Sequence, residues 1–79
     1  MSVEEIMSET VLRITRKQGF DFKKTTTFED LEADSLDIVQ ILVALEDHFD
    51  IEIDDEELKE ITNMGGMIAY VERKIAEKG

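Results

Sequence analysis

Ser35 is the residue of this sequence best placed to do chemistry, because of its position in the stretch EADSLDIVQ at residues 32–40. It stands between Asp34 and the apolar run that begins at Leu36, a pattern typical of the start of a helix. The first N–H groups of a helix and the positive end of its dipole favour a phosphate that is attached or docked there. Asp34 or Ser35 could equally serve as an ordinary N-cap. The local residues alone leave both interpretations open.

Other kinds of chemistry lack the residues that they need. The chain has no cysteine, so it has no thiolate nucleophile or thiolate metal ligand, and no disulfide can form. His48 is the sole histidine, and no GxSxG elbow, GxGxxG loop or Walker motif is present. An EF-hand loop beginning at Asp50 would place Asp55 where glycine is required and Ile61 where a bidentate glutamate belongs. We therefore expect a non-catalytic protein without a specific metal site.

Negative charge is concentrated in one part of the chain. The formal net charge is -11, and 14 of the 20 acidic residues lie within 29–60, where Lys59 is the only base. This segregation costs stability through self-repulsion, and it favours a surface that steers toward basic partners. It excludes nucleic acid as a direct partner, because phosphate binding needs clustered lysine and arginine. A purely acidic binding protein, such as a nucleic-acid mimic, is the alternative that needs this charge but not Ser35.

Hydrophobic spacing predicts the helices that would position Ser35. The first helix begins with the capping-box spacing of Ser2 and Glu5, and Gly19 is its predicted stop. The second helix spans residues 35–49 and has an unusually broad apolar face. Between them lies a long loop over residues 20–33, which we expect to be anchored by Phe20, Phe22, Phe28 and Leu31.

The rest of the chain predicts a connector and two more helices. Residues 50–53 are too short and isolated to pair as a strand, so we expect Ile51 and Ile53 to point inward from a connector. A short helix restarts at Asp54 and runs to about Ile61. Asn63 then caps a last helix, which continues to the basic residues near the end of the chain and has two glycines early in it. These glycines weaken its first turn, and they allow either close backbone approach or motion there.

These elements predict an all-α fold for residues 1–79, as one domain. The arrangement we expect is a four-helix bundle with a short third helix and a long loop between the first two helices. The longest apolar run, from Ile41 to Leu45, is far shorter than the roughly 20 residues that span a bilayer. The N-terminal stretch is acidic where a signal peptide would be basic. We expect a cytoplasmic protein without a transmembrane segment, active as a monomer.

The whole pattern resembles a known family. The stretch LEADSLDIVQILVALEDHFDIEI at residues 31–53 is similar to the acyl carrier proteins of fatty acid and polyketide synthesis. The stretch EITNMGGMIAYV at residues 60–71 is similar to the start of that family's final helix. Asp34-Ser35-Leu36 alone would be a weak match, but the helix, the connector, the acidic balance and the length together make the resemblance specific.

The resemblance implies that Ser35, flanked by Asp34 and Leu36, carries a covalent 4′-phosphopantetheine donated by coenzyme A through a phosphopantetheinyl transferase. The arm would hold acyl groups as thioesters in fatty acid or related lipid or polyketide biosynthesis. Amino acid or polyketide cargo in a specialised pathway is the alternative within the class. The partners implied are the transferase and acyl-transferring or synthase enzymes with basic surfaces. The residues implied to bind them are Asp37, Val39, Val43, Glu46 and Asp47.

The sequence also departs from the family's pattern at several positions. Glu32 stands where many members have glycine, Gln40 where an acid is common, and Asp54 where proline often follows the connector. These departures indicate a specialised carrier. The resemblance further implies a core able to admit an acyl chain, although plain packing explains the same side chains. Those core positions are Leu42, Leu45, Ile53, Leu58, Ile61, Ile68 and Val71.

Overall fold

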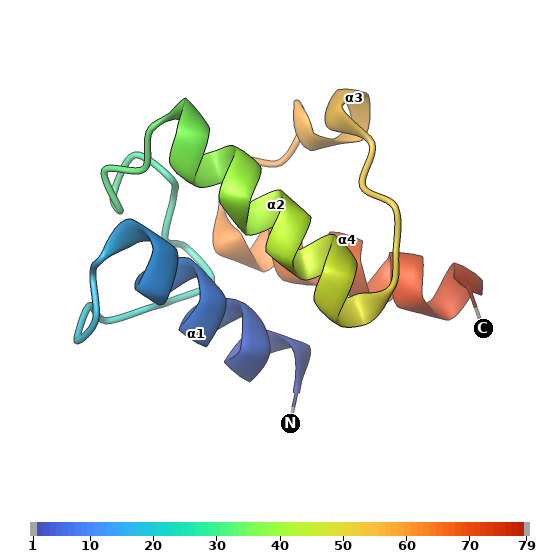
Figure 1. Cartoon of the computed structure of the whole chain (residues 1–79), viewed down its shortest axis with the longest axis horizontal. Coiled ribbons are helices and arrows are strands. Elements are labelled where there is room, and N and C mark those ends of the chain that lie inside the picture. The colour runs from blue at the N-terminus through green and yellow to red at the C-terminus, as the bar shows by residue number, and fades with distance from the viewer. Residues whose placement is uncertain (1, 79) are drawn as a thin grey trace.

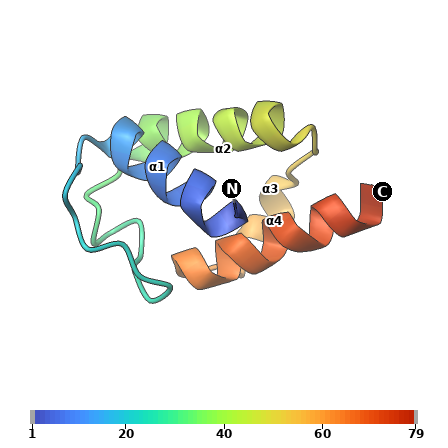
Figure 2. The ribbon, with the colours of Figure 1, turned by 90° about the horizontal axis from the view of Figure 1, so that it is seen from below.

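The computed structural model describes residues 2–78, except for the side chain of Asp55, and every regular element in that part of the chain is a helix. The helices are α1 (Val3–Thr15), α2 (Ser35–Phe49), α3 (Asp55–Leu58) and α4 (Met64–Lys78) (Figure 1). α1 packs against both α2 and α4, and Figure 2 shows α2 and α4 on opposite sides of the molecule. The predicted fold is therefore confirmed, including the short third helix and the long loop between α1 and α2.

α1 begins as predicted but ends earlier. The Ser2 hydroxyl accepts from the Glu5 N–H at 3.1 Å, and the Glu5 carboxylate accepts from the Ser2 N–H at 3.3 Å, which completes the capping box. The prediction that Gly19 stops this helix is wrong. α1 ends at Thr15, because Arg16 adopts a left-handed φ of 62° and its N–H turns back onto carbonyls of the last turn. Gly19, with a φ of 91°, makes a later turn in the loop.

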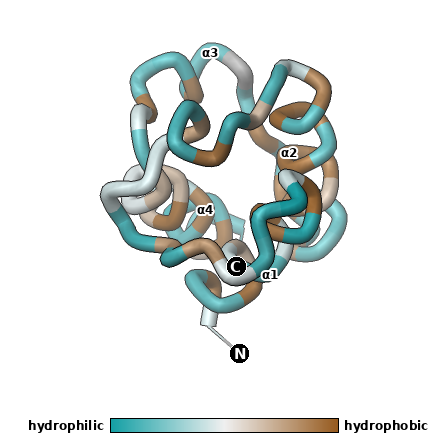
Figure 3. Tube along the Cα trace, turned by 90° about the vertical axis from the view of Figure 1, so that its left-hand side faces the viewer, coloured by the Kyte–Doolittle hydropathy of each residue, from teal (hydrophilic) through white to brown (hydrophobic). Residues whose placement is uncertain are grey.

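The core is shared by α1, α2, α4 and the segments that join them. Phe20, Phe22 and Phe28 pack against it from the long loop, and Leu31 is fully buried, so the predicted anchoring of this loop is confirmed. Along the tube in Figure 3, hydrophobic positions recur between hydrophilic ones, as expected for helices with an inward face. The buried apolar side chains are Met7, Val11, Leu31, Ile41, Leu45, Ile51, Met64, Met67, Ile68, Tyr70 and Val71.

The long loop also holds the start of α4. The Met64 N–H donates to the Thr26 carbonyl and the Gly65 N–H donates to the Lys24 carbonyl, each at 2.7 Å. A Cβ atom on Gly65 would lie 3.0 Å from both the Cβ and the carbonyl oxygen of Lys24. The glycine therefore permits the close backbone approach that the sequence suggested. The side chain of Asn63 accepts from an N–H of the first turn at 2.9 Å, which confirms it as the N-cap.

The segment between α2 and α4 follows the prediction in part. Ile51 is buried and Ile53 packs half-buried against the core, so their inward orientation is confirmed. α3 is shorter than predicted and ends at Leu58 instead of near Ile61. The chain turns there, since the Ile61 N–H donates to the Leu58 carbonyl three residues back, at 3.0 Å, and the helical ladder does not continue.

Candidate functional site

The start of α2 separates the two roles that the sequence left open for Asp34 and Ser35. Asp34 is the N-cap: its carboxylate accepts from the Asp37 N–H at 2.8 Å, and the Asp37 carboxylate accepts from the Asp34 N–H at 3.4 Å. Ser35 is the first residue of the helix and its side chain is exposed. Within residues 2–78 its hydroxyl makes no hydrogen bond. The cap therefore does not need this serine.

Two backbone donors at the start of α2 have no acceptor among the described residues. The Asp37 N–H is used by the cap and the Ile38 N–H donates to the Asp34 carbonyl at 3.0 Å. The N–H groups of Ser35 and Leu36 donate to no acceptor in the described part of the chain. With the positive end of the helix dipole, they form an environment that stabilises an anion next to the Ser35 hydroxyl.

α2 carries an exposed apolar stripe that leads away from Ser35. Among residues 2–78 the large exposed hydrophobic side chains are Leu36, Val39 and Val43, at 64%, 54% and 50% exposure. Their spacing places them on one face of the helix, whereas Ile41 and Leu45 are fully buried on the other. This explains the broad apolar face of the sequence, because one part of it packs in the core and the other faces solvent.

The three acidic residues of α2 that the resemblance assigns to partner binding lie in different surroundings. Asp37 belongs to the capping box and Asp47 is exposed. The Glu46 carboxylate is half-buried and accepts from the Ile53 backbone N–H at 2.9 Å, so it holds the connector to α2. Among the described residues, none of these three carboxylates forms an ion pair. Asp47 therefore extends the apolar stripe with a charge that is free to meet a cation.

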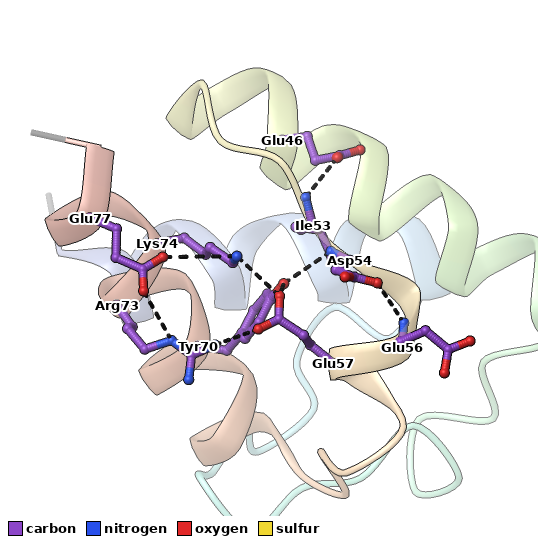
Figure 4. A network of polar contacts seen from close by, with 9 residues as sticks. All are labelled: Glu46, Ile53, Asp54, Glu56, Glu57, Tyr70, Arg73, Lys74 and Glu77. Atoms are coloured by element: carbon purple, nitrogen blue, oxygen red, sulfur yellow. Dashed lines mark hydrogen bonds and ion pairs between the residues drawn. The ribbon is translucent and has the colours of Figure 1, made fainter.

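A second polar cluster, which joins α3 to α4, was missed by the sequence analysis (Figure 4). The Tyr70 hydroxyl accepts from the Asp54 backbone N–H and donates to the Glu57 carboxylate, each at 3.0 Å. The same carboxylate pairs with Arg73 at 2.9 Å and with Lys74 at 3.0 Å. We call these five residues the α3–α4 cluster. The signal that could have found it was the sole tyrosine of the chain, whose hydroxyl needs a partner when buried.

The α3–α4 cluster shifts the titration of its members. The hydrogen bond from Lys74 lowers the pKa of the Glu57 carboxyl, and the bond from Tyr70 lowers it further. The same bond to Glu57 raises the pKa of Lys74. Burial raises the pKa of the Tyr70 hydroxyl, which keeps it a donor throughout the physiological range.

The described part of the chain offers neither a cluster of metal ligands nor a membrane-spanning helix. Among the side chains that the structure describes, those of residues 2–78 without Asp55, no group of three or more histidine or carboxylate side chains is arranged to hold a metal ion. In that same part of the chain no helix is both long enough and apolar enough to cross a bilayer. The features that remain are the exposed Ser35 hydroxyl, the open helix start and the apolar stripe.

Known proteins are similar to this chain in sequence and in fold. Residues 5–71 match the family described as "Phosphopantetheine attachment site". The acyl carrier proteins of Streptococcus thermophilus (strain CNRZ 1066) and Streptococcus pyogenes serotype M1 are each 40% identical over 74 residues, which cover 94% of this chain and 97% of theirs. The holo acyl carrier protein from Geobacter metallireducens is similar in structure, with a TM-score of 0.86 and 25% identity over 99% of this chain and 91% of that one. The acyl carrier protein from Thermotoga maritima is also similar in structure, with a TM-score of 0.75 and 28% identity over 100% of this chain and 96% of that one.

A match over this much of the chain defines a protein with a phosphopantetheine attachment site. The chain belongs to the acyl carrier protein family. It carries acyl groups, and its cofactor is a covalently attached 4′-phosphopantetheine. Proteins of this family work with synthase and transferase enzymes. The resemblance stated from the sequence is confirmed.

Proposed function

We propose that Ser35 is the residue that bears the phosphopantetheine arm. The proposal is supported by the different roles of Asp34 and Ser35 at the start of α2. Asp34 caps the helix, and the Ser35 hydroxyl is exposed and makes no hydrogen bond within residues 2–78. A phosphodiester at this position would lie next to the N–H groups of Ser35 and Leu36, and an anion is stabilised there. When bound, the arm supplies the reactive thiol that this cysteine-free chain lacks.

The exposed stripe of α2 supports a proposed docking surface for partner enzymes. Leu36, Val39 and Val43 offer apolar area beside the attachment point, and Asp47 adds a charge in line with them. An apolar stripe with acidic neighbours is complementary to a partner patch that is apolar at its centre and basic at its rim. Asp37 and Glu46 contribute negative charge to the same surface, but their carboxylates are also engaged in holding the fold.

The proposal also covers the cargo of the carrier, its biosynthetic pathway and its location in the cell. We infer a carrier of acyl intermediates in fatty acid or related lipid biosynthesis, without catalysis of its own, that works as a monomer in the cytoplasm. Its partners would be a phosphopantetheinyl transferase and acyl-transferring or synthase enzymes with basic surfaces. The uncharged Gln40, exposed on the same helix, favours a specialised partner set.

The attachment of the arm is tested by mass measurement. The chain is incubated with coenzyme A and a phosphopantetheinyl transferase of broad specificity, and its mass is followed. We expect the gain of one phosphopantetheinyl group in the parent chain and in Ser8→Ala, and no gain in Ser35→Ala. Circular dichroism should show that Ser35→Ala keeps the helical fold, because Asp34 makes the cap. Loading that survives Ser35→Ala would refute the proposed attachment residue.

A further inference from the structure

A tight turn leads the chain from the long loop into α2. It closes with two backbone hydrogen bonds of the kind that ends a helix. The Ala33 N–H donates to the Phe28 carbonyl, and the Glu32 N–H donates to the Glu29 carbonyl, each at 3.0 Å. This pair of bonds goes with a left-handed residue at the end of the turn, and Glu32 has a φ of 55°. Glu32 therefore sets the direction in which the chain leaves the turn, two residues before the N-cap of α2.

The conformation of Glu32 is one that glycine adopts freely and other residues adopt at a cost. A side chain in the left-handed region brings its Cβ close to the carbonyl oxygen that follows it. Among the described residues two other non-glycine residues have a positive φ, and these, Arg16 and Asp50, end α1 and α2. Glu32 adopts it without a regular helix before it, so a contact of its side chain is needed to favour this conformation.

Lys17 supplies that contact. Its Nζ donates to Oε2 of Glu32 at 2.7 Å, and the two groups form an ion pair. Lys17 lies two residues beyond α1, and its own N–H donates to the Leu12 carbonyl at 2.9 Å, so its backbone is fixed to that helix. The hydrogen bond from Lys17 lowers the pKa of the Glu32 carboxyl. The ion pair thus connects the turn before α2 to the end of α1.

The direction of the chain at this turn decides which residue caps α2. Asp34 is extended, with φ -88° and ψ 162° replaced by no other geometry than its own ψ of -179°, and its carboxylate accepts from the Asp37 N–H at 2.8 Å. If the extended conformation fell one residue later, Ser35 would become the cap, and its hydroxyl would fold over the helix start to accept from a backbone N–H. The Ser35 oxygen would then be engaged where it has to form a bond to phosphorus.

We propose that Glu32 is a positioning residue for attachment of the arm. Its left-handed conformation, held by the ion pair with Lys17, makes Asp34 the cap of α2 and presents the Ser35 hydroxyl to the transferase. This inference rests on the proposed function, in which Ser35 bears the phosphopantetheine. It adds a requirement that lies outside α2, in the turn and in the end of α1.

Loading by the transferase tests this role through substitutions at Glu32. Glu32→Val opposes the left-handed conformation, because β-branched residues rarely adopt it, and should lower kcat for loading about tenfold. KM for the chain should change little, because the exposed stripe of α2 is unaltered. Glu32→Gly adopts the same conformation without strain, so it should load within about twofold of the parent. Lys17→Met, which perturbs the turn less, should lower kcat about two- to threefold in the parent and leave Glu32→Gly unchanged.

Asp50→Val is the matched control at the other end of α2. Asp50 also has a left-handed φ, of 54°, and its carboxylate also pairs with a lysine, Lys78, at 3.3 Å. The substitution imposes the same strain and removes the same kind of ion pair, so it should lower stability and leave kcat for loading unchanged. An equal loss of kcat in Asp50→Val and Glu32→Val would show general destabilisation and overturn the proposal. An equal loss in Glu32→Gly and Glu32→Val would overturn it as well, because the transferase would then recognise the carboxylate itself.

The position of the cap is tested without the transferase by urea unfolding. In the parent, Asp34→Ala should lower the free energy of unfolding, because it removes the acceptor of the cap. In Glu32→Val the same change should cost less, because Ser35 has become the cap. Additive losses would overturn the positioning role, since they would show that Asp34 caps α2 in both chains. Loading of the parent that survives Ser35→Ala would instead overturn the proposed function, so the two failures are distinguishable.

Discussion

The two long helices that flank α3 begin in opposite ways. At the start of α4 every one of the first four N–H groups is used: two bind loop carbonyls, at Thr26 and Lys24, and two bind the side chain and carbonyl of Asn63. At the start of α2 only the third and fourth are used, both by Asp34. The N–H groups of Ser35 and Leu36 face no acceptor within residues 2–78.

This difference separates a structural helix start from a functional one. Each helix has an N-cap, so capping does not distinguish them. What differs is whether the chain covers the first two donors with its own backbone. The long loop covers them at α4 and leaves them open at α2, and an open helix start is where an anion is best stabilised. The functional start is therefore recognised by what the fold leaves unused.

The largest expected effect concerns the stripe beside the open start. The double variant Leu36→Ala/Val43→Ala should lower kcat/KM for loading by the transferase about 10- to 100-fold, because truncating buried interface anchors typically costs 1–3 kcal/mol in total. Its free energy of unfolding should stay within about 0.5 kcal/mol of the parent, since both side chains are exposed.

The control for the stripe lies on the opposite face of α2. Ile41→Val removes one methyl group from a fully buried side chain and should cost about 0.5–1.5 kcal/mol of stability without affecting loading. Equal loading by the double variant and the parent would mean that the transferase does not contact this face. The two variants together separate docking from folding.

The next largest effect concerns the start of α4, where each of the first four N–H groups has an acceptor. Gly65→Ala should destabilise the fold by about 1–2 kcal/mol, because the new Cβ meets Lys24 at 3.0 Å and the clash outweighs the gain in helix propensity. In Gly66→Ala the new Cβ meets side-chain atoms, Cγ2 of Ile61 at 3.2 Å and Oδ1 of Asn63 at 3.5 Å, so the propensity gain should leave this variant as stable as the parent or more so. Urea unfolding measures both, and equal losses would argue against backbone contact as the cause.

Much of the contrast between the two helix starts can be predicted from the sequence. Local patterns gave the helices, the Asn63 cap and the position of Ser35, because capping residues and hydrophobic spacing act over a few neighbours. They could not decide between Asp34 and Ser35 as the cap of α2. Both side chains are good caps, and the choice depends on the angle at which the loop enters the helix.

Long-range polar contacts could not be predicted from the sequence for a different reason. Tyr70 meets Asp54 and Glu57 only because the connector folds back over α4, and no local pattern encodes that approach. The end of α1 was misplaced because Arg16 adopts a left-handed conformation that glycine usually takes. Sequence reasoning placed the stop at Gly19, the residue type that most often has this conformation.

A third prediction tests whether the two helix starts are equally capped. Asp34→Ala and Asn63→Ala should each lower the free energy of unfolding by about 0.5–2 kcal/mol, because each removes the side-chain acceptor of a cap. Asp34→Asn, which keeps an acceptor oxygen, should recover most of the loss at α2. A much larger loss at one start would show that capping itself distinguishes the two, contrary to the comparison.

The smallest effect concerns the contrast between Asp47 of α2, which has no ion pair in the described part of the chain, and Glu57 of α3, which pairs with Arg73 and Lys74 of α4. The bond from Lys74 lowers the pKa of Glu57 below its ordinary value of 4.5, so the folded state binds this proton less tightly than the unfolded state. The stability that the Glu57 carboxylate contributes is therefore complete above its ordinary pKa and is lost as the pH falls through the lowered value. In urea unfolding, the difference in free energy of unfolding between the parent chain and Glu57→Gln should therefore shrink as the pH falls over that range.

Glu60→Gln is the control, because it removes the same charge from a residue that has no ion pair among the described residues. It only relieves repulsion, so it should be at least as stable as the parent at neutral pH. If Glu57→Gln behaved like Glu60→Gln, the acids near α3 would be as free as Asp47.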